Sequence, residues 1–315
     1  MPDGTQEKKR SQEQIDGLLV LNKPSGPTSA ACLNDIKYQL KQFKIGHAGT
    51  LDPLAQGVLL VLLGHGTKLA TYLSGATKTY RGTLKLGIAT DTYDIQGEIT
   101  SQADVTASVE DVEKEILHWN QLTEQEVPAY SAAKHEGKPL YAMAREGLAT
   151  PVKTKPIVVS HVEVLDVRMP EAAFRVSCSA GTYIRSLVHS LGSRMGCGAV
   201  LTSLIRERSE PFGFEAAHDL ADVLENPDSF PDKVIPLRDT LPHWPRFMLT
   251  KPLTSLVKNG AWLPVNDQPG EPLGGNPGDR AFLLDDQGVP LALVEVQLQD
   301  DKPKWAILRG LWDQD

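Results

Sequence analysis

Apolar and polar residues follow two different periods in the first ninety residues of this chain. Residues 16–24 are mostly apolar and end in a proline, which predicts a buried strand. Residues 28–42 carry apolar side chains at helical spacing behind Thr28 or Ser29, either of which is a suitable N-cap, so they predict a helix. In residues 77–88 apolar and polar side chains alternate, which predicts a half-buried strand.

The middle of the chain repeats these two patterns. Residues 108–120 predict a helix whose first and fourth residues have capping-box chemistry. Residues 128–147 predict a loop with many Pro and Gly residues, then a short helix closed by a glycine. Residues 156–169 and 173–180 predict strands, and 182–196 predict a helix with an apolar stripe. Helices and strands therefore share one α/β fold of the α+β type.

Composition changes near residue 248 and divides the chain. A Pro-rich passage over residues 234–247 predicts a boundary, and residues 249–315 show short β segments joined by turns, as in a small all-β domain. The polar start, residues 1–14, predicts a disordered tail. We therefore expect a main domain over residues 15–248 and a C-terminal β domain.

The cysteines and the apolar runs bear on where the protein works. The three cysteines, Cys32, Cys178 and Cys197, form no CxxC pair, which favours reduced thiols and a cytoplasmic location. No apolar run reaches the ~20 residues that a membrane helix needs. We therefore expect no membrane partner.

The net charge of −8 hides an uneven distribution. Residues 22–85 hold eight Lys and Arg against two acids, a net of +6, and residues 128–156 hold five against two, a net of +3. Residues 249–315 hold six against ten, a net of −4. A local basic face suits RNA phosphates, although solvated surface charges explain the same counts equally well.

Asp52 is the carboxylate whose setting is most unusual. It lies in a Gly-rich turn, is fixed by a following proline, and comes directly before a buried strand. Local chemistry alone also fits a simple turn-capping role for Asp52. The chain has no P-loop, no HExxH, no GxSxG and no dinucleotide-binding motif. These absences favour chemistry without a cofactor or a metal, or no chemistry.

Five segments together resemble the TruB family of stand-alone tRNA pseudouridine-55 synthases. They are long, ordered along the chain, and spread over most of its first two hundred residues. The segments are "LNKPSGPTS", "GHAGTLDPLAQGVLLVLLG", "KTYRGTLKLGIATDTYDIQGE", "PAYSAAKHEGKPLYAMAREG" and "CSAGTYIRSL". The aspartate is followed by "DPLA" rather than the basic "DPK" typical of guide-dependent relatives, which favours the stand-alone branch.

The resemblance implies seven site residues. They are Lys23, His47, Asp52, Tyr80, Tyr183, Arg185 and Leu204. Asp52 would be the nucleophile or base, Arg185 its ion-pair partner, and Tyr80 a ring that stacks on the flipped uracil and takes part in catalysis. Core packing for Tyr80 and a surface position for Arg185 are the simpler alternatives.

The remaining residues of this set are expected to bind substrate. His47 would occupy the space that the flipped base leaves, Tyr183 would form a wall of the pocket, and Leu204 would contact the base. Lys23 would contact a phosphate, or else it is a solvent lysine at a strand end.

The resemblance also implies the fold and the partners. We expect a mixed, largely antiparallel sheet with flanking helices, a T-loop-gripping insertion over residues 121–155, and a PUA-like RNA-binding domain over residues 249–315. The partner would be the T-stem-loop of tRNA, bound by a monomer without guide RNA, metal or cofactor. The rival hypothesis is a non-catalytic tRNA-binding or tRNA-folding protein of the same fold.

Overall fold

A computed structural model describes residues 13–265 and 275–312 of the chain. Its largest element is a ten-stranded sheet. The main path runs through β11 (Val159–Arg168), β12 (Glu171–Cys178), β4 (Lys78–Leu86), β13 (Ala199–Ser209), β3 (Gln56–Leu63), β1 (Gly17–Lys23) and β15 (His218–Asp219). Three further strands pair at its sides: β2 (Ile45–His47), β14 (Phe212–Gly213) and β16 (Val234–Pro236).

The sheet is mixed and mostly antiparallel, as the family resemblance implied. β13 runs parallel to β3, and β1 runs parallel to β15, whereas the other pairs are antiparallel. The β13–β4 register places Arg206 opposite Tyr80, and Leu204 opposite Gly82. β13 therefore joins the half of the sheet that carries Tyr80 to the half that carries Asp52.

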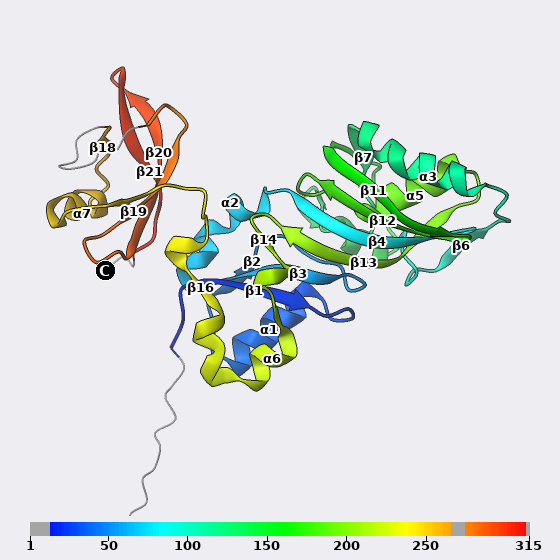
Figure 1. The fold of residues 1–315 in the computed structure, drawn as a ribbon, viewed down its shortest axis with the longest axis horizontal. Helices are drawn as coiled ribbons and strands as arrows, with labels where there is room; N and C mark the ends of the chain where they lie inside the picture. Colours follow the sequence, from blue (N-terminus) through cyan, green and yellow to red (C-terminus); the bar gives the residue numbers. More distant parts are fainter. Residues whose placement is uncertain (1–12, 266–274, 313–315) are drawn as a thin grey trace, which may run out of the picture.

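Among the described residues six α-helices precede the C-terminal sheet, and side-chain caps explain where two of them begin. They are α1 (Ser29–Gln39), α2 (Ala70–Ser74), α3 (Val109–Leu117), α4 (Leu140–Arg145), α5 (Ile184–Arg194) and α6 (Leu220–Glu225). Thr28 caps α1 by accepting a hydrogen bond from the Ala31 amide at 3.0 Å, and Ser108 and Asp111 form the predicted capping box on α3. Figure 1 shows α3 and α5 beside β11 and β12, with α1 and α6 beside β1.

Both faces of the central strands are buried. Alternate residues of β1 and β3, such as Leu19 and Val61, pack into a core with α1, α3 and α5. Their neighbours, such as Leu18 and Leu60, pack into a second core that includes Phe282 of the C-terminal sheet. β1 and β3 are therefore continuously apolar rather than alternating. No helix among the described residues is long and apolar enough to cross a membrane.

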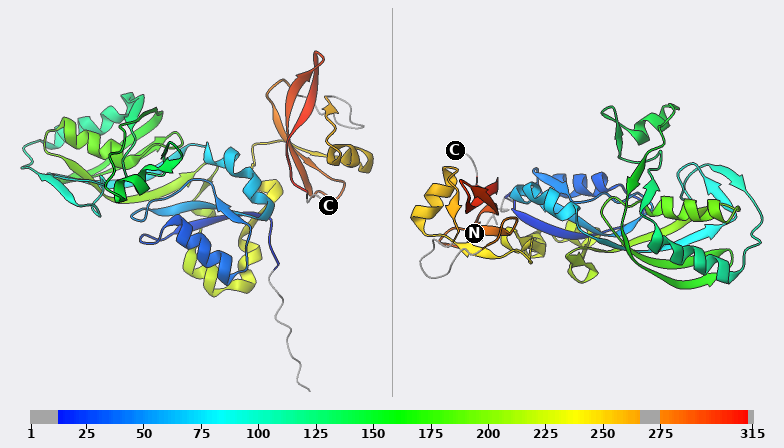
Figure 2. Two further views of the ribbon diagram at one scale, coloured as in Figure 1. Left: turned by 180° about the vertical axis from the view of Figure 1, so that it is seen from behind. Right: turned by 90° about the horizontal axis from the view of Figure 1, so that it is seen from above.

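The segment predicted as an insertion carries small elements of its own. β7 (Glu124–Glu126) pairs with β10 (Thr154–Pro156), and between them lie α4 and the hairpin of β8 (Lys134–His135) and β9 (Lys138–Pro139). In the right-hand view of Figure 2 the part that carries α4 projects from the body of the molecule. A separate hairpin joins β5 (Ile88–Thr90) to β6 (Ile99–Gln102).

The C-terminal region forms a second, five-stranded sheet (Figure 1). Its order is β17 (Arg246–Met248), β19 (Arg280–Leu284), β20 (Pro290–Gln299), β21 (Lys302–Gly310) and β18 (Leu263–Pro264). The sequence predicted these strands but missed α7 (Lys251–Lys258), which begins the region. β17 lies before the predicted boundary yet pairs with β19, so the division at residue 248 stays a prediction.

The predicted tail, residues 1–14, falls mostly outside the described residues. Gln14, at its end, donates to the Gln42 side chain at 3.0 Å, and that side chain also accepts from the Ile15 amide at 2.9 Å. Ordered structure therefore includes Gln14.

Candidate active site

The backbone on both sides of Asp52 is held by side chains from β1 and α1. Asp52 follows β2, in the loop that leads into β3. Ser29 binds Leu51 twice, donating to its carbonyl and accepting from its amide, both at 2.9 Å. Lys23 donates to the Ala55 carbonyl at 2.7 Å. The turn that carries the carboxylate is therefore fixed at its start and at its end.

Lys23 does not have the exposure that the sequence suggested. Its side chain is 0% exposed, and its ammonium donates to the main-chain carbonyls of Pro24 and Ala55. Burial lowers the pKa of Lys23, and the negative charge of Asp52 opposes that shift. Both sequence hypotheses, a phosphate contact and a solvent lysine, are wrong for this geometry, because the ammonium is enclosed by backbone.

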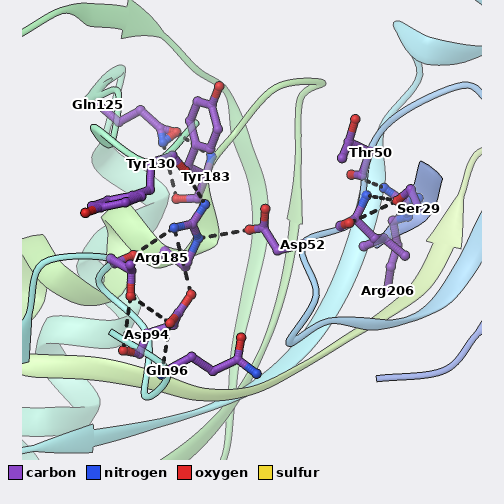
Figure 3. A network of polar contacts seen from close by, with 12 residues as sticks. Ser29, Thr50, Asp52, Asp94, Gln96, Gln125, Tyr130, Tyr183, Arg185 and Arg206 are labelled. Atoms are coloured by element: carbon purple, nitrogen blue, oxygen red, sulfur yellow. Dashed lines mark hydrogen bonds and ion pairs between the residues drawn. The ribbon is translucent and has the colours of Figure 1, made fainter. Parts of the chain in front are cut away.

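Arg185 joins Asp52 to two other segments, as Figure 3 shows. Its Nε donates to Asp52 Oδ2 at 2.9 Å, Nη1 donates to the Thr92 carbonyl at 2.7 Å, and Nη2 donates to the Tyr130 carbonyl at 3.0 Å. Only 6% of its side chain is exposed, against 41% for Asp52. The surface alternative for Arg185 is therefore wrong, and the predicted pair with Asp52 is present.

A second carboxylate stands behind this pair. Asp94 lies 3.8 Å from Arg185 Nη1 and accepts hydrogen bonds from the Thr92 hydroxyl at 2.8 Å and the Gln96 amide at 3.1 Å. Asp94 thus shapes the turn whose Thr92 carbonyl binds the guanidinium. Sequence reasoning did not single out Asp94, because its partner is ninety residues away.

Tyr183 is positioned through its backbone. The Gln125 side chain accepts from the Tyr183 amide at 2.8 Å and donates to the Tyr183 carbonyl at 3.3 Å. The Lys155 ammonium lies 6.0 Å from the centre of the Tyr183 ring. Gln125 and Lys155 belong to the predicted insertion, which therefore contacts the start of α5 directly.

Five of the seven predicted site residues line one cavity of about 220 Å³. They are Asp52, Tyr80, Tyr183, Arg185 and Leu204. A second cavity, of about 350 Å³, shares Thr50, Asp52, Ser131, Ala132 and Arg185 with the first, and its other lining residues include Tyr130 and Arg145 of the insertion. The carboxylate therefore stands where the two cavities meet, accessible from both.

His47 lies on β2, next to β3, and does not line the cavity with Asp52. Burial lowers the pKa of His47, and the nearby charge of Arg206 lowers it further, so the ring stays neutral near pH 7. Its proposed place in the gap left by a flipped base stays a prediction.

The sequence reasoning missed the two other charged residues that line the cavity, Lys78 and Arg206. Lys78 shares the inward face of β4 with Tyr80, and Arg206 shares the inward face of β13 with Leu204. Both are almost fully buried. The sequence did contain a signal for both. Each lies two residues from a predicted site residue on the same strand, and residues two apart on a strand point to the same face.

Solved structures of similar fold define the class. This chain matches a chain in the crystal structure of a Cbf5-Nop10-Gar1 complex with a TM-score of 0.68 and 25% identity, covering 97% of this chain and 88% of that one. It matches one in the structure of an H/ACA RNP bound to a substrate RNA containing 2′-deoxyuridine with a TM-score of 0.67 and 26% identity, covering 95% and 86%. Residues 37–184 match the model of the TruB family pseudouridylate synthase N-terminal domain. The fold is that of a pseudouridine synthase.

Curated relatives identify the branch. The chain is 55% identical over 302 residues to the tRNA pseudouridine synthase B of Oleidesulfovibrio alaskensis, covering 95% of this chain and 97% of that protein. It is 50% identical over 303 residues to that of Nitratidesulfovibrio vulgaris, covering 96% and 98%. The chain belongs to the tRNA pseudouridine synthase B family, whose members are isomerases.

Proposed function

We propose that this protein converts the T-loop uridine at position 55 of tRNA to pseudouridine, with Asp52 as nucleophile or base. The observation that carries the proposal is the buried Arg185 guanidinium bound to a half-exposed Asp52 carboxylate at the junction of two cavities. An adjacent guanidinium that donates a hydrogen bond to a carboxylate fixes the orientation of that carboxylate. A carboxylate prepared in this way is suited to covalent or base catalysis on a bound nucleoside.

The target uridine must leave its stack to reach Asp52, at a cost of roughly a few kcal/mol. Tyr80 and Leu204 offer the base a ring and an apolar side chain on the same face of the sheet. Burial raises the pKa of the Tyr80 hydroxyl, so it stays protonated and able to donate a hydrogen bond. The insertion, residues 121–155, would hold the T-loop over this cavity.

We further propose that the protein acts alone, as a monomer without guide RNA. The relatives named tRNA pseudouridine synthase B support the stand-alone branch, and the monomeric state stays a prediction. The C-terminal sheet is expected to position the RNA. Action in the cytoplasm stays a prediction.

The test uses purified protein and an unmodified tRNA transcript, with pseudouridine mapped by position. Asp52→Asn is expected to bind the transcript normally and to form no detectable pseudouridine, because the amide keeps the shape but not the charge. Turnover by the variant would refute the role of Asp52, and product only at other uridines would refute the assigned position. A wild-type protein that binds and refolds tRNA without isomerising it would favour the non-catalytic alternative.

A further inference from the structure

Three buried cations lie in or next to the cavity and form no ion pair with a carboxylate of the described residues: Lys78 and Arg206 line it, and Lys23 donates to the carbonyl of Ala55, which lines it. Lys23, Lys78 and Arg206 are 0%, 4% and 1% exposed. Each donates to main-chain carbonyls, and among the residues that the structure describes no acidic side chain forms an ion pair with any of them. Burying a charge without an opposite charge beside it carries a large desolvation cost. Burying these three cations lowers the stability of the folded protein, so a contribution to stability does not explain why they are there.

Two of these cations face the space in which a base would lie. Lys78 and Tyr80 are two residues apart on β4 and therefore point to the same face of the sheet. Arg206 lies opposite Tyr80 on the neighbouring strand β13. Both cationic side chains converge on Gly49, where an added Cβ would lie 3.6 Å from Arg206 Nη1 and 3.7 Å from Lys78 Cε. All four residues line the cavity with Asp52.

Both cations retain donor capacity. Lys78 Nζ donates to the carbonyls of Ser74 at 2.5 Å and Ala76 at 2.7 Å, which leaves one of its three N–H groups. Arg206 donates to the carbonyls of Val58 at 2.6 Å, Thr50 at 3.3 Å and Gly49 at 3.0 Å, and it also hydrogen-bonds the Tyr80 hydroxyl, so one of its five N–H groups remains. The carbonyls hold the two side chains in place before any ligand arrives.

We propose that Lys78 and Arg206 form a cationic floor that stabilises the negative charge which uracil acquires when its bond to ribose breaks. The inference rests on the proposed function. The C1′–N1 bond breaks and its electron pair leaves with the base, spread over N1 and the two carbonyl oxygens. After rotation, C1′ bonds to C5, the C5 proton is lost and N1 gains a proton, so the sum is an isomerisation.

Electrostatics explains why such a floor is needed. Asp52 alone would repel an anionic base, and Arg185 offsets only that one charge. Preorganised donors in a water-poor site stabilise developing charge without reorganising during the reaction. Lys78 and Arg206 would act as catalytic residues by touching the base, a role distinct from that of Asp52.

The test compares variants of Lys78 in single-turnover reactions with saturating T-arm RNA. Lys78→Met and Lys78→Gln remove the charge, and the glutamine keeps amide donors for the two carbonyls. Both are expected to slow the reaction about 100-fold or more, the effect of losing one such donor, with RNA affinity unchanged. Lys78→Arg should retain most of the rate, and Lys85→Met, on the opposite face of β4, should match the wild type.

A better leaving group should relieve the defect. With 5-fluorouridine at the target position, the electron-withdrawing fluorine stabilises the anionic base by induction, so loss of the N-linked nucleoside should be much less sensitive to Lys78→Met. Wild-type rates in the Met and Gln variants, equal defects with both bases, or a loss of RNA affinity alone would overturn the proposal. An inactive Asp52→Asn beside a fully active Lys78→Met would refute the cationic floor and leave the proposed function standing.

Discussion

Replacing Arg185 by lysine tests whether charge or geometry orients Asp52. Lysine keeps a positive charge but lacks the planar fork, so it can retain one of the three hydrogen bonds and leaves the carbonyls of Thr92 and Tyr130 without their donor. Each hydrogen bond to a charged group is worth about 1.5–3 kcal/mol, so two lost bonds set an upper range of roughly 3–6 kcal/mol.

Water can replace part of the lost hydrogen bonding, because Thr92 and Tyr130 are only partly buried. We therefore take about 3 kcal/mol as the loss in transition-state stabilisation, which corresponds to a rate reduced roughly 100-fold. The assay is the single-turnover rate of pseudouridine formation at saturating T-arm RNA. RNA affinity should change little, since the guanidinium is enclosed by protein.

Arg194→Lys is the matched control on the same helix. Arg194 binds Glu115 at 2.7 Å with 30% of its side chain exposed, and it lies outside the cavity. This exposed pair is worth at most about 1 kcal/mol, so the control should keep its rate. A folded Arg185→Lys protein with the wild-type single-turnover rate would show that the fork does not orient Asp52.

Three further predictions concern stability. Gly57→Ala should lower the free energy of unfolding in chemical denaturation by more than ~3 kcal/mol, because its Cβ would lie 2.4 Å from the Arg206 carbonyl oxygen at φ +106°. The control Gly137→Ala, at φ +86° with open space around the added Cβ, should lower it by only about 1–2 kcal/mol. Equal losses in the two variants would contradict this account. Phe282→Ala should lower the free energy of unfolding by about 3–5 kcal/mol, because Phe282 of the C-terminal sheet packs in a core with residues of the large sheet. The two sheets should still melt in one transition at a lower temperature, and two separate transitions would refute their coupling. Burial lowers the pKa of Lys78 from 10.5 to about 8, so the unfolded chain holds the extra proton between these values and wild-type stability should rise with pH there. The free energy of unfolding of Lys78→Met relative to wild type should fall over that window, and a constant difference would contradict the shift.

Local sequence predicted the elements whose determinants are local. The N-cap at Thr28, the capping box at Ser108 and the alternation of β4 all act within a few residues, and the structure has each of them. The helix α7 was missed because turn-rich sequence surrounds it, and its Thr250 N-cap makes no side-chain capping hydrogen bond.

Burial and long-range register could not be predicted in the same way. Lys23 was expected to reach phosphate or solvent because lysines are seldom fully buried. Its ammonium is buried because the loop after Asp52 folds over it and supplies the Ala55 carbonyl, a contact between segments about thirty residues apart. Arg206 escaped notice because its three acceptors lie about 150 residues earlier in the chain. Such contacts depend on which strands become neighbours, which no local pattern contains.

Under the proposed function, the contacts of Arg185 would connect RNA binding to the chemistry at Asp52. One guanidinium binds the Asp52 carboxylate, the Thr92 carbonyl and the Tyr130 carbonyl, and Tyr130 belongs to the segment expected to hold the T-loop. A shift of that segment would remove one of the three acceptors and free the guanidinium to turn. The orientation of Asp52 therefore depends on the position of the insertion, although the two are separated by more than seventy residues along the chain.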